Sequence, residues 1–326
     1  MTSDENPRHV QVLAVGMTYR DLVMTGLETM PRPGEEIYAS ALHETWGGVA
    51  TMARVCNALG LATGLATAVG DDAASARLLD DMARAGVDTS LTARHPGWAL
   101  PVTVALSTSD DRAMVTVEAP PPAGVTDHLE HTAFTADAVI VDMRDPAMGW
   151  LQRARARGTK VYASRGFDPT GEWSAESLAD DGTCDVWMLN DLEARAFTGL
   201  DDPVAAARML SGRVPMVVVT RGAAGMVGVD CATGEEASID AFRVQPLNLT
   251  GAGDSTLAAL AYAGLVPGAG LTDRLDLAAF IAGSILERPQ GAARPPALDE
   301  LVARTDSGTD ARLPRIRELL TSGMRS

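Results

Sequence analysis

Short apolar runs alternate with helix-period stretches through the middle of the sequence. Strands are predicted at 138–141, 161–163, 186–189 and 216–220, and helices at 150–157, 192–198 and 204–210. Repetition of strand and helix implies right-handed crossovers between parallel strands, with helices covering both faces of the sheet. We therefore expect an α/β fold with three layers around a mostly parallel central sheet.

The flanking segments extend this pattern. A first strand is predicted at 10–15, and helices at 49–59 and 72–84 are each followed by a glycine that ends them. Further strands are predicted at 61–69, 225–229 and 237–244, and further helices at 254–265, 275–287 and 315–321. With 326 residues, 46% of them hydrophobic, the chain can form a substantial core.

Two segments carry strand signals that do not fit the main sheet. Residues 18–46 alternate loosely around the turn Pro31-Arg32-Pro33-Gly34, and strands at 103–106 and 113–117 flank Asp110-Asp111-Arg112 as a hairpin. We expect these strands, within about 18–46 and 100–118, to form a small β-sheet lid. The expected organisation is one domain over residues 10–303, lid included, and a C-terminal extension with a helix over 304–326.

The charge balance argues against polyanionic partners. Lys and Arg number 27 against 43 Asp and Glu, a formal net charge of -16, so the molecule as a whole repels nucleic acid and anionic lipid. An anionic substrate then needs donors placed locally. The first residues lack an apolar signal region, and the run at 257–266 is too short to span a bilayer, so a cytoplasmic protein is predicted.

The strongest local signal is the glycine-rich turn Asn248-Leu249-Thr250-Gly251-Ala252-Gly253-Asp254, placed between a strand and an apolar helix. Its glycines let the backbone approach a ligand closely, and the first N–H groups of the helix lack intrahelical partners. Asp254 lies in the same first turn, where the helix dipole favours the ionised carboxylate. A carboxylate beside an anion hole suits phosphoryl transfer to an alcohol. The alternative is a plain helix start with Thr250 as its cap.

Further motifs occur in order along the chain. They are Gly47-Gly48-Val49-Ala50-Thr51-Met52, Ala68-Val69-Gly70-Asp71-Asp72, Asn190-Asp191-Leu192-Glu193, Thr220-Arg221-Gly222-Ala223-Ala224-Gly225 and the turn ending at Asp254. This order resembles that of the ribokinase-like (PfkB) carbohydrate kinase family, over roughly residues 10–292. The resemblance implies a ribokinase-like three-layer fold with a β-sheet lid, and an ATP-dependent phosphotransferase with an alcohol group as acceptor.

The resemblance also implies a role for each matching residue. Asp254 is the implied general base, and Gly251, Ala252 and Gly253 form the implied anion hole for the transferred phosphoryl group. The implied nucleotide-binding residues are Asn190, Glu193, Thr220, Arg221, Gly222, Gly225, Thr250 and Gly291. ATP and Mg²⁺ are the implied cofactors, with Glu193 acting on the metal through water because Mg²⁺ retains part of its hydration shell.

The acceptor side of the implied site departs from the family pattern. The implied substrate-binding residues are Asp21, Gly47 and Gly48, and we predict Met52, Thr103 and Arg165 on the same side of the site. Met52 stands where sugar kinases have an asparagine that binds hydroxyls, and Tyr19 replaces another polar residue, which removes hydrogen bonds to a polyol. Asn248 replaces an aspartate near the loop that binds a monovalent cation in many members, so activation by potassium is doubtful.

Several of these residues have a structural alternative. Asn190 and Glu193 also fit a helix capping box with no metal role. The glycines at 222 and 225 also fit a hairpin turn, Asp21 an exposed loop carboxylate, and Arg221 a solvated surface position. Trp46 packs either against a substrate ring or within the lid.

The sequence leaves more than one function open. The leading hypothesis is phosphorylation of a sugar, sugar acid or sugar phosphate. A nucleoside kinase is the alternative, since Met52, Tyr19 and Trp46 suit an apolar base, and a non-catalytic ligand-binding regulator is a third hypothesis. Lys160, the only lysine, precedes Val161, which excludes a Walker A motif and a protein-kinase catalytic set. Exposed lid strands often pair between subunits, so we predict a homodimer.

Overall fold

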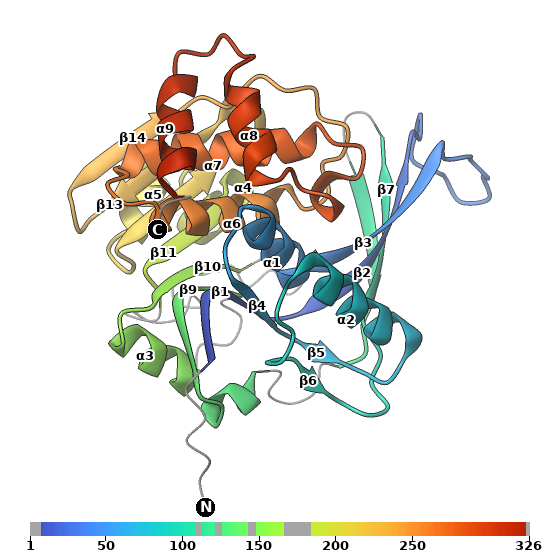
Figure 1. The fold of residues 1–326 in the computed structure, drawn as a ribbon. Coiled ribbons are helices and arrows are strands. Elements are labelled where there is room, and N and C mark those ends of the chain that lie inside the picture. The colour runs from blue at the N-terminus through green and yellow to red at the C-terminus, as the bar shows by residue number, and fades with distance from the viewer. Residues whose placement is uncertain (1–7, 109–111, 121–125, 143–147, 166–183, 324–326) are drawn as a thin grey trace, which may run out of the picture.

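The computed structural model describes residues 8–108, 112–120, 126–142, 148–165 and 184–323 (Figure 1). Eight of the described strands form one sheet in the order β14-β13-β12-β11-β10-β9-β1-β4. The pairs from β4 to β12 are parallel, and β12, β13 and β14 pair antiparallel. Their bounds are β1 (Arg8–Val15), β4 (Thr63–Ala66), β9 (Phe134–Asp142), β10 (Lys160–Ser164), β11 (Val186–Asn190), β12 (Met216–Thr220), β13 (Met226–Asp230) and β14 (Glu235–Ile239).

Helices cover both faces of this sheet, as the strand alternation predicts. In β1, Val12 and Ala14 join one hydrophobic cluster, and Leu13 and Val15 join the other. The first cluster contains side chains of α1 (Val49–Ala58), α2 (Ala73–Ala85), α6 (Ala252–Leu265), α7 (Leu271–Leu286), α8 (Leu298–Thr305) and α9 (Leu313–Gly323). The second contains side chains of α3 (Gly149–Ala156), α4 (Asp191–Thr198) and α5 (Pro203–Leu210). The fold is therefore a three-layer α/β arrangement.

A separate four-stranded sheet, the lid sheet, projects from one side of the molecule (Figure 1). Its order is β3-β2-β7-β8, with bounds β2 (Thr18–Thr25), β3 (Ala41–Gly48), β7 (Val102–Ser107) and β8 (Arg112–Val117). One face, the inner face, buries Asp21, Val23, Thr103 and Ala105. Alternate residues lie on the outer face, where Leu22, Val104 and Val115 are register neighbours. The lid predicted from the sequence is thus present as a sheet of its own.

The predicted elements differ from the observed ones in several places. The strand predicted at 61–69 is two short strands, β4 in the main sheet and β5 (Ala68–Val69), which pairs with β6 (Ala93–Arg94). Arg112, predicted in a turn, begins β8, while residues 109–111 lie outside the described residues. Helix α8 was not predicted. Short 3-10 turns occur as η1 (Asp127–Glu130), η3 (Gly222–Ala224) and η4 (Gly291–Ala293).

The strand predicted at 237–244 ends at Ile239 for a visible reason. The carbonyl of Asp240 accepts a hydrogen bond from Arg312 at 2.8 Å. Phe242 turns towards α7 and packs edge-on against Phe280, with ring centroids 5.5 Å apart. Residues 240–244 therefore follow α7 and do not extend the sheet.

Helix α6 is buried on nearly all sides. Every residue from Ser255 to Ala263 is buried, and the helix packs against α1, α7 and the sheet strands β9 and β10. This burial explains its continuous apolar sequence, and it fixes the glycine-rich turn that precedes the helix. No helix among the described residues has the length and apolar character needed to cross a membrane.

Candidate active site

Helix α6 begins at the glycine-rich turn. Gly251 is the N-cap, with a positive φ of 76°, and Ala252 is the first helical residue. The alternative of Thr250 as a side-chain cap is wrong, since the helix start has no side-chain cap bond and the hydroxyl oxygens of Thr250 and Ser255 are buried without a hydrogen-bond partner. A Cβ added at Gly253 would meet none of the described residues within 4 Å, so the backbone there is not covered by them. The turn thus offers an accessible helix N-terminus.

The turn is supported from behind by two elements. The Asn248 side chain accepts a hydrogen bond from the Thr250 N–H at 2.9 Å. Gly291 of η4 packs on that side chain, since a Cβ added at Gly291 would lie 3.2 Å from Cγ of Asn248. An added Cβ on Gly251 would lie 3.4 Å from Ala292 and 3.5 Å from Thr51 of α1. Gly291, predicted on the nucleotide side, is therefore in direct contact with the glycine-rich turn.

Asp21 is a buried carboxylate on the inner face of the lid sheet. It lies in β2, opposite Thr45 and Thr103, and is only 6% exposed, so the alternative of an exposed loop carboxylate is wrong. Burial, and secondly the charge of Asp254, raise its pKa from 3.8 to about 7, while a hydrogen bond with Thr103 and the charge of Arg112 oppose the shift. The structure thus brings Asp21, Thr103 and Asp254 to one place.

Gly47 is required for this arrangement. A Cβ at residue 47 would lie 2.3 Å from Oδ2 of Asp21, closer than any side chain tolerates. Gly48, with a φ of 62°, is the N-cap of α1, and a Cβ there would meet the Met17 carbonyl at 2.4 Å. The glycine pair lets β3 pass close to the carboxylate and then start the helix.

Arg112 is a site residue that sequence reasoning missed. It reaches from the edge strand β8 to the glycine-rich turn, where Nη1 donates to the Leu249 carbonyl at 2.6 Å. Thr116, further along the same strand, shares a hydroxyl hydrogen bond of 3.0 Å with Thr103. The signal in the sequence was an arginine directly after two aspartates, which was read as turn composition.

The residues predicted to bind nucleotide phosphates lie at the carboxyl ends of neighbouring strands. Asn190 ends β11 and Thr220 ends β12, and the two are register partners. Asn190 and Glu193 form a capping box: the Asn190 side chain accepts the Glu193 N–H at 2.8 Å, and Glu193 accepts the Asn190 N–H at 2.9 Å. Burial raises the pKa of Glu193. No cluster of three metal-binding side chains occurs among the described residues.

The predicted turn at 222–225 joins β12 to β13. The Arg221 N–H donates to the Gly225 carbonyl at 2.8 Å, and an added Cβ on Gly225 would lie 2.0 Å from the Ile239 carbonyl oxygen. Arg221 donates to the Ser238 hydroxyl and the Ile239 carbonyl, both at 3.3 Å. The turn is therefore a tight hairpin connection packed on the end of β14.

The remaining predicted residues lie near the core. Met52 is 6% exposed and belongs to the hydrophobic cluster around α6. Arg165, directly after β10, lies over the Phe197 ring at 5.7 Å. Trp46 is 3% exposed and donates its indole N–H to Asp81 at 2.9 Å, which places it in the fold and not against a substrate ring.

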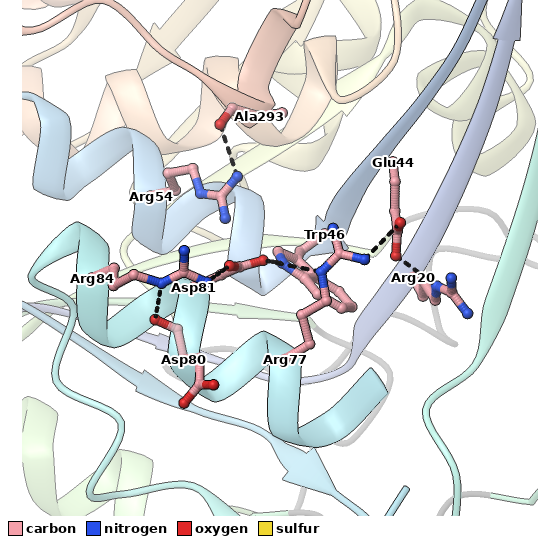
Figure 2. Close-up of polar contacts among 9 residues, drawn as sticks. All are labelled: Arg20, Glu44, Trp46, Arg54, Arg77, Asp80, Asp81, Arg84 and Ala293. Carbon is pink, nitrogen blue, oxygen red and sulfur yellow. Dashed lines mark hydrogen bonds and ion pairs between the residues drawn. The ribbon is translucent and has the colours of Figure 1, made fainter. Parts of the chain in front are cut away.

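Trp46 belongs to a charged network at the base of the lid sheet (Figure 2). Glu44 accepts from Arg20 of β2 and from Arg77 of α2, each at 2.8 Å. Asp81 of α2 accepts from Trp46 and also from Arg84. The network therefore fastens strands β2 and β3 to helix α2.

A family model and three solved structures are similar to this chain. A model described as "pfkB family carbohydrate kinase" matches residues 10–297. A putative ribokinase from Agrobacterium tumefaciens has a TM-score of 0.73 and 21% identity, covering 98% of this chain and 100% of that chain. Arabidopsis thaliana ribokinase, solved with ribose and ATP, has a TM-score of 0.72 and 21% identity, covering 92% and 98%. A nucleoside kinase from Methanocaldococcus jannaschii has a TM-score of 0.69 and 19% identity, covering 91% and 99%.

Proposed function

Because the chain belongs to the PfkB family of carbohydrate kinases, we propose that it transfers the γ-phosphoryl group of Mg-ATP to a hydroxyl of a sugar or sugar derivative. The observation that carries this proposal is the pairing of two carboxylates where the lid sheet meets the start of α6. Asp21 belongs to the first and Asp254 to the second, and the charge of Asp254 raises the pKa of Asp21. One carboxylate is available to hold the acceptor and the other to activate it.

In this mechanism Asp254 accepts the proton of the attacking hydroxyl. The hydroxyl oxygen forms a bond to the γ-phosphorus as the bond from that phosphorus to the bridging oxygen breaks, which leaves ADP. The N–H groups of Gly251, Ala252 and Gly253 donate to the phosphoryl oxygens at the open start of α6. The Ala252 N–H already donates to Leu249 over a long 3.3 Å, a bond that a charged ligand would replace.

Asp21 binds other hydroxyls of the acceptor. With a pKa of about 7 it accepts hydrogen bonds when ionised and can also donate one when protonated. Thr103, hydrogen-bonded to it, fixes its orientation. The alternative of a nucleoside acceptor relied on Trp46 and Met52 to contact the base. Trp46 is buried, and Met52 lies in the core cluster. We therefore favour a sugar-like acceptor over a nucleoside.

The residues present fit a magnesium ion held mainly by the triphosphate. Mg²⁺ commonly takes only one or two carboxylates and keeps several waters. Glu193, half-buried in the first turn of α4 with a raised pKa, would hold such a water, and Asn190 would keep the carboxylate in place through the capping box. The ion supplies neutralisation of charge on the β- and γ-phosphates.

The base of the nucleotide has a cavity available beside the turn at 222–225. It has a volume of about 750 Å³ and lies between residues 240–244, α7 and residues 304–313. Phe242 and Phe280 supply aromatic walls, and Arg312 lies 3.7 Å over the Phe242 ring. Gly225 packs on residues 239–241, and residues 240 and 241 also line the cavity. Its size suits a small planar ligand.

The outer face of the lid sheet supports a homodimer. Val115 is 66% exposed, and its register neighbours Val104 and Leu22 in the central strands are only half-buried. Leu42 is 60% exposed and lies opposite the half-buried Met24. An apolar face on central strands is typically covered. A second copy, presenting the same face about a two-fold axis, would cover it and protect the edge strand β8.

The test is ADP release from Mg-ATP with a panel of pentoses, hexoses, sugar acids, sugar phosphates and nucleosides. We expect one acceptor class to stimulate release strongly, and Asp254→Asn to lose on the order of 10³-fold in kcat. Asparagine has nearly the same shape as aspartate, but its amide group cannot accept the proton of the acceptor hydroxyl. Wild-type protein that turns over no acceptor while still binding its ligand would overturn the proposal in favour of a ligand-binding regulator.

A further inference from the structure

A half-buried arginine on α1 contacts the η4 turn, which packs on the glycine-rich turn. Arg54 donates through Nη1 to the carbonyl of Ala293 in η4 at 2.8 Å (Figure 2). Burial lowers the pKa of Arg54, and the charge of Asp81 on α2 opposes this shift. The guanidinium group thus extends from α1 to η4, and the charge of Asp81 favours its protonated form.

The η4 turn that Arg54 holds is in contact with the phosphoryl side of the site. Ala292 lies 3.4 Å from an added Cβ on Gly251, and Gly291 packs on the Asn248 side chain that accepts the Thr250 N–H. A shift of η4 would therefore move Gly291 and Ala292, which pack on the glycine-rich turn. Arg54 of α1 holds η4 through its hydrogen bond to the Ala293 carbonyl.

The same contacts close into a ring around the base of the site. Thr51, one helical turn before Arg54, touches Gly251 and donates its hydroxyl to the Trp46 carbonyl at 2.7 Å. The Trp46 indole donates to Asp81, whose charge acts on Arg54. Trp46 directly precedes Gly47, which packs on Asp21. The ring thus joins the acceptor side to the phosphoryl side.

We propose that Arg54 is a positioning residue for phosphoryl transfer, which holds η4 and so keeps the N–H groups of residues 251–253 in register with the acceptor held by Asp21. It acts through Ala293 and Ala292 and touches neither substrate. This inference rests on the proposed function of the turn. An arginine suits the task because its planar fork can serve two partners in different directions, whereas a lysine ammonium is a point charge on a flexible stem.

The role predicts a selective loss. A turn that is shifted still leaves the cavity beside Phe242 available, so ADP should bind as before, while the contacts to the γ-phosphate should weaken. A purely structural arginine would lower thermal stability and leave the relative affinity for the two nucleotides unchanged. The difference between ADP and a non-hydrolysable ATP analogue therefore separates the two roles.

The experiment compares wild type, Arg54→Gln, Arg54→Lys and the control Arg84→Gln. Arg84 also donates to Asp81, but its side chain is 74% exposed. Calorimetry with Mg-ADP and Mg-adenylyl imidodiphosphate gives the affinity gained from the γ-phosphate, and the kinase assay gives kcat and KM. We expect Arg54→Gln to lose roughly 10-fold in that gain and on the order of 10²-fold in kcat, with acceptor KM nearly unchanged. Arg54→Lys should have values of the γ-phosphate affinity gain and of kcat between those of wild type and Arg54→Gln. Arg84→Gln should match wild type in both quantities.

Asp81→Asn provides a second variant in which Arg54 is retained but less firmly held. It should shift kcat in the same direction by a smaller factor, and melting temperatures of all variants report folding separately. Arg54→Gln that keeps the γ-phosphate gain and kcat would overturn the inference while leaving the kinase intact. Wild type that binds neither nucleotide would overturn the proposed function and this inference together.

Discussion

Arg112 of the lid sheet donates to the backbone carbonyl of Leu249 at 2.6 Å, across 137 residues of sequence. The same carbonyl accepts the Ala252 N–H at 3.3 Å. The lid sheet and the start of α6 therefore share one acceptor group, and the charge of Arg112 also acts on Asp21. Arg112 therefore links the lid sheet to the start of α6 and also favours the ionised form of Asp21.

Replacing Arg112 by Gln should change the pH dependence of the reaction. Its charge favours the ionised form of Asp21, so its loss raises the pKa of that carboxyl above about 7. We expect kcat/KM at pH 7 to fall roughly 10-fold and to recover partly at more alkaline pH. Arg112→Lys, which keeps the charge, should retain the wild-type profile. A uniform loss at all pH values in both variants would contradict this role.

Asp21 should make the protein less stable as pH rises. Its carboxyl has a pKa of about 7 in the folded protein, against an ordinary value of 3.8, so the folded state binds the proton more tightly. The stability that this proton contributes is present below pH 4 and is lost as pH rises through 7. Asp21→Asn, which cannot ionise, should gain up to about 4 kcal/mol over wild type between pH 4 and pH 8.

Urea unfolding at pH 4, 6 and 8 measures this difference. Asp254→Asn serves as the control, because removal of its charge should lower the pKa of Asp21 and reduce the slope. Parallel stability curves for wild type and Asp21→Asn would show that burial does not perturb the carboxyl.

The homodimer proposal predicts a face-specific effect of charge. Val115→Glu places a carboxylate on the outer face of the lid sheet, where a second copy would bury it, so dissociation is expected at micromolar concentration. Met114→Glu places the same charge on the inner face and should leave assembly unchanged. Light scattering of both variants distinguishes the two faces. A monomeric wild type would refute the dimer directly.

The cavity beside α7 predicts a selective effect on nucleotide binding. Phe242→Ala removes an aromatic wall, and loss of one aromatic contact of about 1 kcal/mol should raise KM for ATP roughly fivefold to tenfold. KM for the acceptor should stay near the wild-type value. Val214→Ala, a buried truncation in the hydrophobic cluster on the opposite face of the sheet, controls for a general loss of stability. Equal nucleotide affinity in the two variants would place the base elsewhere.

The regular part of the fold could be predicted from the sequence because its signals are local. Strands such as β11 and β12 are continuous apolar runs, and α2 is marked by Asp72 at its start and Gly86 at its end. The break of the strand predicted at 61–69 could not be predicted, since β4 and β5 differ only in which distant strand they pair with. Helix α8 is short, and its N-cap is an alanine with no side-chain acceptor.

In the candidate site too, features that are local in the sequence could be predicted and long-range contacts could not. The glycine-rich turn and Asp254 are adjacent in sequence, and the structure gives them the expected helix start, although Gly251 and not Thr250 is the cap. The contacts of Arg112 and Arg54 were not predictable, because each joins a side chain to a backbone carbonyl more than a hundred residues away. A carbonyl acceptor has no side-chain signature in a sequence.

The lid sheet has its own hydrogen-bonded ladder, separate from the eight-stranded sheet that carries α6. Apart from Arg112, which contacts the glycine-rich turn, residues on β2, β7 and β8 can therefore be substituted without disturbing the backbone of that turn. A protein built this way can change what it recognises faster than how it reacts, and exchanging these strands with those of a relative is a practical route to a kinase with a new acceptor.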